Sequence, residues 1–328
     1  MPVARAGRSS ASEEIESTCY FACPEIINAV EFSPYQNTSK LIAYGGESRI
    51  CIGSCSFDDE NLQEFQFEHQ VDISHGARVD AIAWSPQSSL DQYPGLLRFC
   101  TAGGDKKLRC FSVDLRDNST VQMLDGHESY INDCVFNPLQ GDAIASVSDD
   151  HTCRMWDVES GQETALFHLT SPGVSVKWIP NEPNKLLVAQ KNGTIRIYDI
   201  VSQRPFMSFS TLTSPLKCVD WSTANPIRVG GVVSNEWEIW DISQYSSPQA
   251  SKEAHIEGAC SFRWCKLTDG IFATSGRPGN QVKVFQVGHH KNPVTANLKV
   301  GGGLSWHSRL PICAAGGDHA VHLWRLEL

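Results

Sequence analysis

The chain contains 328 residues, of which 41% are hydrophobic and 20% are charged, so it can bury a sizeable core and is not a disordered protein. Its net charge of -10 at pH 7 argues against a protein whose main task is to grip nucleic-acid phosphates. No long apolar run suited to a membrane span occurs, and the N-terminus lacks the apolar segment of a secretory signal. We therefore expect an intracellular protein with no direct membrane insertion and no direct binding to nucleic acid.

The first residues of the chain, 1–14, are polar and contain several serines, two arginines and two glutamates. They show no apolar periodicity, so we expect a disordered N-terminal tail. The following segment, 15–23, reads IESTCYFAC and has the character of a short strand.

A repeat begins after this segment. Strand-like runs end in an aromatic residue at intervals of 52, 52, 42, 43, 43 and 42 residues. In four of the seven runs a proline follows two residues later, which ends a strand because proline cannot donate to the ladder. The seven aromatic residues are Phe32, Trp84, Phe136, Trp178, Trp221, Trp264 and Trp306.

Each aromatic residue is followed by two further apolar runs. The first runs end in small residues and lie at 41–46, 97–104, 143–150, 186–193, 227–235, 271–279 and 312–318. The second runs alternate in polarity, as strands do, and lie at 49–52, 107–111, 152–157, 194–199, 237–241, 282–285 and 321–324. Almost nothing in these units has helical periodicity, so we expect an all-β protein.

Seven units of this length, each with three recognisable strands and room for a fourth, resemble the blades of WD-repeat propellers. The resemblance is most specific at Gly126-His127 and Trp156-Asp157, which match the two signature dipeptides of that family. The chain stops just after the third strand of the last unit, so the segment at 15–23 is expected to complete that blade and close the ring. We therefore predict one seven-bladed propeller over residues 15–328.

The segment at 145–157, ASVSDDHTCRMWD, has the side chains of a nucleophilic or metal site, but the WD-repeat resemblance implies a structural role. In such blades four positions form a buried hydrogen-bond chain, and here they are His127, Ser146, Asp150 and Trp156. Unpaired buried polar groups cost about 1 to 3 kcal/mol each, so linking them locks the turn to the sheet. No oxyanion donor or nucleophile elbow accompanies these residues, and we expect no enzymatic activity.

The other units keep this pattern only in part. Unit two retains His75, Thr101 and Asp105 but has Phe111 in place of the tryptophan, and unit six retains His255 without an aspartate. Only unit three is complete, so its blade is expected to be the most rigid.

The twelve cysteines include no C-x-x-C pair, and the two C-x3-C pairs have no matching second pair for structural zinc. Such cysteines are expected to be small buried apolar residues. The triple glycine at 301–303 lacks the spacing and the helix of a phosphate-binding loop. The sequence therefore predicts no metal and no cofactor.

Six blocks of sequence, in this order and spacing, carry a closer resemblance. They lie at 41–46, 75–86, 145–157, 191–199, 301–311 and 315–319. Together they resemble the small single-propeller WD-repeat nucleoporins of the animal Y-shaped outer-ring complex, and the similarity extends over nearly the whole chain after the tail.

This resemblance implies a non-enzymatic scaffold role in the nuclear pore complex. A member of that family docks on the large nucleoporin that combines a propeller with an α-solenoid, and meets other Y-complex members indirectly. The resemblance also implies location at the nuclear envelope, a part in pore assembly and in protein and mRNA transport, and kinetochore association in dividing cells.

The first two intervals of the repeat are each about ten residues longer than the others. The extra length falls within 53–74, 85–97 and 112–122, which we expect to form long loops. Long loops on a rigid scaffold often carry binding sites, so blades one, two and seven are candidates for the partner surface. The alternative is that these three segments are insertions that the fold tolerates and that bind no partner. The candidate contact residues are Phe57, Phe65, Phe67, Asp91, Tyr93 and Arg116.

Other functions of WD-repeat propellers remain alternatives. A substrate receptor of a ubiquitin ligase often carries W-D-x-R, but the arginine is absent after Trp156-Asp157 and after Trp240-Asp241. A reader of histone tails or other peptides would use the central channel. A propeller hydrolase would need repeated histidine and carboxylate ligands, and the strands show no such pattern.

Overall fold

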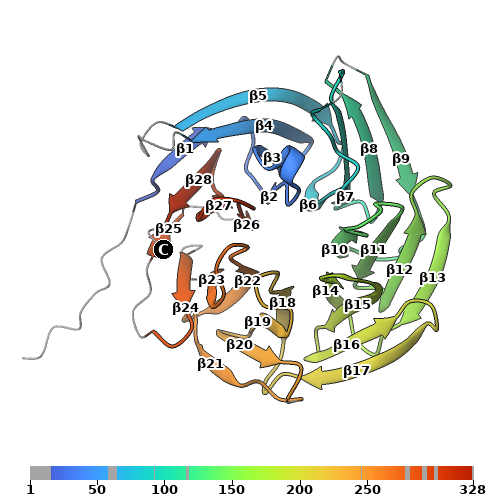
Figure 1. The fold of residues 1–328 in the computed structure, drawn as a ribbon, viewed down its shortest axis with the longest axis vertical. Helices are drawn as coiled ribbons and strands as arrows, with labels where there is room; N and C mark the ends of the chain where they lie inside the picture. Colours follow the sequence, from blue (N-terminus) through green and yellow to red (C-terminus); the bar gives the residue numbers. More distant parts are fainter. Residues whose placement is uncertain are drawn as a thin grey trace, which may run out of the picture.

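The computed structural model describes residues 16–57, 65–91, 93–115, 118–244, 246–277, 281–289, 294–298 and 302–326. These residues form seven four-stranded antiparallel sheets, arranged as blades around a central axis (Figure 1). The one helix in these ranges is a short 3-10 turn at Gln36–Thr38. No helix among the described residues could cross a membrane. The predicted all-β, seven-bladed propeller is confirmed.

In each blade we name the strands a to d from the axis outward. Blades one and two contain β2 (Ala29–Phe32), β3 (Leu41–Gly45), β4 (Arg49–Phe57), β5 (Phe65–Ser74), β6 (Val79–Trp84), β7 (Leu96–Gly103), β8 (Leu108–Asp114) and β9 (Ser119–Leu124). Blades three and four contain β10 (Ile131–Phe136), β11 (Ala143–Ser148), β12 (Thr152–Asp157), β13 (Glu163–His168), β14 (Gly173–Ile179), β15 (Glu182–Gln190), β16 (Thr194–Asp199) and β17 (Arg204–Ser210).

The remaining three blades follow the same order. Blades five and six contain β18 (Leu216–Trp221), β19 (Arg228–Val233), β20 (Glu236–Asp241), β21 (Ala250–Glu253), β22 (Gly258–Trp264), β23 (Ile271–Arg277), β24 (Gln281–Gln286) and β25 (Val294–Asn297). Blade seven contains β26 (Gly302–Trp306), β27 (Ile312–Gly316), β28 (Ala320–Arg325) and, as strand d, β1 (Cys19–Ala22).

The two ends of the chain meet in blade seven. Strand β1 pairs antiparallel with β28, so that Cys19 lies opposite Leu323 and Ala22 lies opposite Ala320. The backbone N–H of Cys23 continues this contact and donates to the carbonyl of His319 at 2.8 Å. Without β1 the last blade would present an unpaired edge, so the predicted closure of the ring is confirmed.

The core lies between the blades rather than in one central mass. Buried apolar side chains form seven clusters in the described part of the chain, one at each junction between neighbouring blades. The aromatic residue that ends strand a is at most 6% exposed in every blade, so each one is a member of the wall between two sheets. Ten of the twelve cysteines are also buried, as small apolar residues would be.

Side chains of strand a also join blades across the inner edge of the sheets. An edge strand presents backbone N–H groups without a ladder partner, and burial of an unpaired N–H is unfavourable. At four junctions a side-chain oxygen in strand a of one blade accepts a hydrogen bond from a backbone N–H in strand a of the neighbouring blade. The backbone N–H donors and their acceptor residues are Val176 to Asp133 at 3.1 Å, Val219 to Ser175 at 3.0 Å, Trp264 to Asp220 at 2.9 Å and Phe32 to Ser305 at 3.0 Å.

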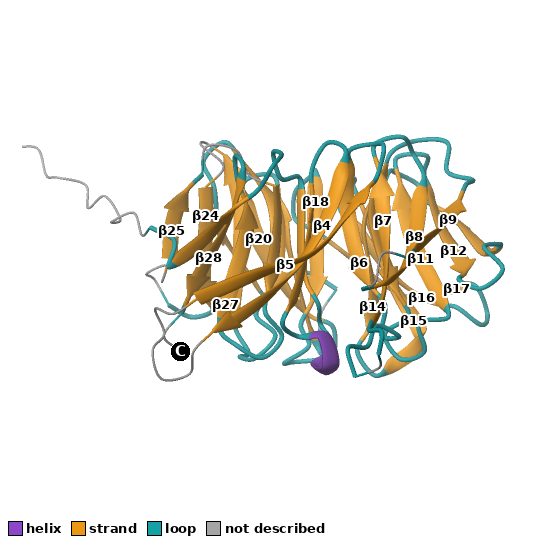
Figure 2. Cartoon of the chain, turned by 90° about the horizontal axis from the view of Figure 1, so that it is seen from above, coloured by secondary structure: helices purple, strands orange, loops and turns teal. Residues whose placement is uncertain are grey.

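The prediction of a long loop over 53–74 is wrong for most of that segment. Residues 53–57 continue β4, and residues 65–74 form the whole of β5. These strands pair from Arg49 opposite Ser74 to Phe57 opposite Phe65, which makes a hairpin longer than any other c–d pair of strands in the described residues. The insertion lengthens strands because its residues alternate in polarity and can pair with each other. Figure 2 shows β5 running obliquely across the side of the molecule.

Candidate functional site

Blade three contains a continuous hydrogen-bond chain that begins at its strand-c tryptophan. The indole Nε1 of Trp156 donates to Ser146 Oγ at 2.9 Å, and Ser146 Oγ lies 2.8 Å from His127 Nε2. The other ring nitrogen, His127 Nδ1, lies 2.7 Å from Asp150 Oδ2. The structure thus brings together the four residues that the repeat pattern singled out.

The directions of these bonds follow from the protonation of the histidine. Burial lowers the pKa of His127 below its ordinary value, although the Asp150 carboxylate opposes this shift. The imidazole is therefore neutral at pH 7, so Nδ1 donates to Asp150 and Nε2 accepts from the Ser146 hydroxyl. Burial alone would raise the pKa of Asp150, but hydrogen bonds from Thr152 and His127 hold it below its ordinary value.

Asp150, His127 and Ser146 have the connectivity of a serine-hydrolase triad, but their surroundings differ from those of an active site. Ser146 is 0% exposed, and its oxygen already accepts the indole N–H of Trp156. A nucleophile must reach a substrate carbonyl, and this hydroxyl has neither an open face nor an open approach. The hydrogen-bond chain instead pairs the polar side chains of its own four residues with one another.

The corresponding positions of other blades are only partly paired. In blade two, His75 Nε2 lies 2.9 Å from Thr101 Oγ1, while Asp105 forms an ion pair of 2.6 Å with Arg109 rather than with the histidine. In blade six, His255 Nε2 lies 2.9 Å from Thr274 Oγ1, and His255 Nδ1 is buried without a partner among the described residues. The histidine pairs with the strand-b hydroxyl in both blades, whereas the retained Asp105 of blade two does not join the chain.

Blade five has a different buried group in this region. Glu238, in β20, is 0% exposed, and both of its carboxylate oxygens lie within 3.3 Å of the backbone nitrogen of Leu212. Burial raises the pKa of Glu238 to about 7, because one backbone N–H does not compensate for the lost hydration of a carboxylate.

Three of the candidate contact residues, all phenylalanines, lie on the β4–β5 hairpin. Phe57, Phe65 and Phe67 are half-buried and pack against the cluster at the junction of blades seven and one. The ring of Phe67 stacks on that of Phe21 in β1, with 3.8 Å between centroids and 5° between planes. The hairpin thus extends from blade one over the strand that closes the ring.

The position of Phe67 is linked to a glycine in the neighbouring strand. Gly53 pairs with Ile42 as Trp156 pairs with Ile144, so Gly53 stands where a WD-repeat blade has its strand-c tryptophan. A Cβ atom at Gly53 would overlap the Phe67 ring. The phenylalanine of strand d therefore occupies the space beside strand c that the missing tryptophan leaves.

The other candidate contact residues belong to the connections of blade two. Asp91 is exposed, and Tyr93 is the most exposed large hydrophobic side chain among the described residues, at 87%. Arg116 lies outside the described residues. The predicted loop over 85–97 is shorter than expected because β7 begins at Leu96, and the segment at 112–122 belongs mostly to β8 and β9.

A groove of about 510 Å³ lies between blades two and three, close to these connections. Its walls include Val121 of β9, which is 53% exposed, and Asp142 of the a–b connection of blade three. Arg98 also lines the groove, and its buried Nε has no partner among the described residues. Apolar and charged groups thus meet in one concave surface.

A second set of charged residues, not predicted from the sequence, lies in the central channel. They sit on strand a or just after it and include Glu31, Asp133, Lys177, Asp220, Arg263 and Lys266. In four blades the available signal was a charged residue directly before the strand-a aromatic, namely Glu31, Lys177, Asp220 and Arg263. Although burial opposes charge, the Asp133 carboxylate at 2.7 Å raises the pKa of Lys177 above its ordinary value.

The similarity to known proteins agrees with the fold and extends over most of the chain. The family described as WD domain, G-beta repeat matches residues 118–157, which include the complete network of blade three. The chain is 44% identical to nucleoporin Nup37 of Mus musculus and to that of Homo sapiens, over 93% of this chain and 96% of theirs. It is 31% identical to nucleoporin Nup37 of Drosophila melanogaster over 82% of this chain and 85% of that protein.

The similarity to the mouse and human nucleoporins extends over 93% of this chain and is therefore not limited to the repeat that defines WD domains. It confirms the resemblance that the six sequence blocks carried. This chain belongs to the Nup37 family of nucleoporins.

Proposed function

We propose that this protein is a non-enzymatic scaffold subunit of the Y-shaped outer-ring complex of the nuclear pore. It docks on the large nucleoporin that combines a propeller with an α-solenoid and meets other members of the complex indirectly. In this role it supports pore assembly and the transport of protein and mRNA, and in dividing cells it accompanies the complex to kinetochores.

The observation that carries this proposal is the whole-length similarity to nucleoporins, at 44% identity over 93% of the chain. The structure adds a physical argument, because the groups that resemble a catalytic triad are buried and mutually hydrogen-bonded. A rigid ring with buried polar networks and exposed connections suits a protein that offers surfaces to partners.

The surface that we propose for docking lies at the connections of blade two and includes the groove toward blade three. The a–b and c–d connections of an antiparallel blade emerge at the same end, so the a–b connections of blades two and three share one face with Tyr93. Exposed apolar side chains on this face include Leu90 and Leu139, and Val121 adds to the adjoining outer wall. Exposed aromatic and aliphatic anchors beside a concave surface are typical of protein interfaces.

Affinity purification of the protein at its endogenous level tests this function. We expect the Y-complex nucleoporins to be recovered and the protein to stain the nuclear rim. Recovery of ubiquitin-ligase subunits or of histones, without nucleoporins, would instead support one of the alternative WD-repeat functions.

A pair of tyrosine variants tests the docking surface. Tyr93→Ala should reduce recovery of the large nucleoporin by about tenfold, since truncating an aromatic anchor commonly costs more than 1 kcal/mol of binding free energy. Tyr130→Ala is the matched control, because Tyr130 is 50% exposed on the d–a connection between blades two and three, at the other end of the propeller. Equal losses in the two variants would contradict the assignment of this face.

A further inference from the structure

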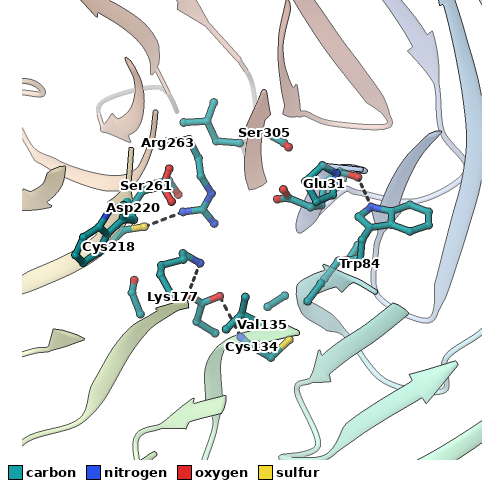
Figure 3. Close-up of a pocket in the computed structure, with 18 of the residues that line it drawn as sticks. Glu31, Trp84, Cys134, Val135, Lys177, Cys218, Asp220, Ser261, Arg263 and Ser305 are labelled. Atoms are coloured by element: carbon teal, nitrogen blue, oxygen red, sulfur yellow. Dashed lines mark hydrogen bonds and ion pairs between the residues drawn. The ribbon is translucent and has the colours of Figure 1, made fainter. Parts of the chain in front are cut away.

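A cavity of about 530 Å³ lies on the propeller axis and is lined by strand a of all seven blades (Figure 3). A volume of this size lies within the range of small-ligand pockets, about 300 to 1,000 Å³. Solvent reaches the cavity, because Lys217 and Cys260 of its wall are exposed.

The charged groups of this cavity are not equally satisfied. Lys177 Nζ donates to Asp133 Oδ2 at 2.7 Å, and Asp220 Oδ2 accepts a backbone N–H of the next blade. Lys266 lies 3.9 Å from Glu31, which is a loose ion pair. The carboxylates of Asp133 and Asp220 thus already have hydrogen-bond partners in a neighbouring blade and hold the blades together.

Arg263 differs from the other basic groups of the cavity. Only its Nη1 donates within the described residues, to Cys218 Sγ at 3.1 Å and to the carbonyl of Phe262 at 3.0 Å. No carboxylate of the described residues lies within ion-pair distance of its guanidinium. Nε and Nη2 are left without a hydrogen-bond partner there, on a group whose planar fork matches two oxygens of one oxyanion.

The opposite side of the cavity has a different character. Blades two and three contribute the apolar side chains of Ala81, Ala83 and Val135 together with the carboxylates of Asp80 and Asp133. Figure 3 shows the Arg263 guanidinium and the Glu31 carboxylate pointing into the cavity from different blades. An occupant would therefore meet a basic group on one side and aliphatic side chains on the other.

We propose that the central cavity binds one carboxylate group. Its oxygens accept from Arg263 and from the free N–H groups of Lys177, and its aliphatic part lies against Ala83 and Val135. Four acidic and four basic side chains line the cavity and balance one another, so a single negative charge fits better than the double charge of a phosphate. The carboxylate belongs either to a small organic acid or to a glutamate side chain of a peptide.

Glu31 competes with such a ligand for the same basic groups. Glu31 lies 3.9 Å from Lys266, so its negative charge compensates part of the positive charge that a bound anion would meet. Removing this carboxylate should therefore strengthen the binding of an anion, whereas it would weaken the binding of a cation.

The test uses the full chain and 4,4,4-trifluorobutyrate, observed by fluorine NMR, which detects binding in the range of about 1 mM. We expect line broadening that unlabelled butyrate reverses. Arg263→Gln should weaken binding by about tenfold, and Glu31→Gln should strengthen it by about threefold. Lys217→Gln is the matched control for charge, because Lys217 is exposed at the rim, and it should change binding by less than about twofold.

Thermal melting of each variant establishes that it is folded. If Arg263→Gln does not fold, Arg263→Lys replaces it, and the loss of the planar fork should still weaken binding. No broadening by the parent protein, equal binding by the Arg263 variant, or weaker binding by Glu31→Gln would each overturn the proposal.

Two capped pentapeptides distinguish the sources of the carboxylate. Displacement of trifluorobutyrate by acetyl-Ala-Ala-Glu-Ala-Ala-amide, but not by the same peptide with glutamine, assigns the cavity to an acidic side chain of a protein. Displacement by butyrate alone assigns it to a small organic acid. Failure of both competitors to displace the probe would show that the broadening does not come from a carboxylate site.

Discussion

His127 in blade three and His255 in blade six occupy equivalent positions, nine residues before the aromatic that ends strand a. Both ring nitrogens of His127 are hydrogen-bonded, whereas only Nε2 of His255 is. Burial lowers the pKa of His255 to about 4, since no carboxylate opposes the loss of hydration. Blade six lacks the aspartate of the complete network, and it also lacks the indole N–H because Phe285 occupies its strand-c aromatic position.

The complete network leads to a prediction about stability. His127→Ala leaves Ser146 and Asp150 without their shared partner inside the blade, so we expect the free energy of unfolding to fall by about 1 to 3 kcal/mol. Urea denaturation measures this change. His168→Ala, an exposed position in the outer strand of the same blade, should alter it by less than about 0.5 kcal/mol.

Recovery of partners should not change in the His127→Ala variant. If that variant kept the full stability of the parent protein and lost a hydrolytic activity, the structural role of this residue would be disproved.

Glu238 leads to a prediction about pH. Its ordinary pKa is 4.5 and its value in the folded protein is about 7, so ionisation weakens the folded state as the pH rises through this interval. Glu238→Gln keeps the acceptor for the Leu212 N–H without the charge. We expect this variant to be more stable than the parent by about 1 to 3 kcal/mol at about pH 8.

The same linkage requires that this difference vanish below about pH 4.5, where Glu238 is neutral in both the folded and the unfolded chain. The buried histidines titrate equally in the two proteins, so they do not contribute to the difference. Urea denaturation at several pH values measures it, and a difference that is independent of pH would contradict the buried carboxylate as its cause.

At the scale of elements, the β4–β5 hairpin combines two substitutions that would each be unfavourable alone. A glycine in the middle of a strand leaves a gap, and a phenylalanine on an outer strand would be exposed. Placed side by side, Gly53 and Phe67 fit together, and Phe67 also stacks on Phe21 of the closing strand. The hairpin therefore links blade one to the closure of blade seven.

Phe67→Ala should loosen this closure. Loss of a half-buried phenylalanine is expected to cost about 2 to 4 kcal/mol, and amides of β1 should exchange faster with solvent. Hydrogen exchange followed by mass spectrometry measures the effect at Cys19–Ala22.

The control for this variant is Phe206→Ala, because Phe206 also lies on an outer strand, β17, but is 61% exposed. We expect no change in the exchange of β1 for this control. Unchanged exchange of β1 in the Phe67→Ala variant would rule out the link between hairpin and closure.

At the scale of the whole molecule, stability depends on a closed circle of seven junctions. Each blade packs only on its two neighbours and gains no stability from contacts with distant blades. Opening one junction therefore exposes two sheet faces at once. The junction between blades seven and one depends on a four-residue strand from the other end of the chain.

Removing residues 1–22 should therefore destabilise the propeller by more than about 3 kcal/mol, because β1 and the buried ring of Phe21 are lost together. Removing residues 1–15 is the matched control and should leave the melting temperature unchanged. Equal melting temperatures for the two truncated proteins would refute a stabilising role of β1.

Several features were predictable because they depend on residues that are close in the sequence. The spacing of aromatic residues showed the number of blades, and the order of His127, Ser146, Asp150 and Trp156 follows the family pattern within thirty residues. The long β4–β5 hairpin of blade one was not predictable, because the extra residues at 53–74 suggested an inserted loop. The residues that pair there, such as Phe57 and Phe65, both belong to that insertion.

By itself the sequence determined the blade count, the closure of the ring by an N-terminal strand, the polar network of blade three and membership of the nucleoporin family, since each follows from a local pattern or from similarity along the chain. Only the tertiary structure decided that Phe67 fills the space at Gly53, and that Arg263 and Glu31 point into one cavity. Those contacts join residues of different strands or blades. Their directions depend on the register of each sheet and on the curvature of the ring, which no single repeat contains.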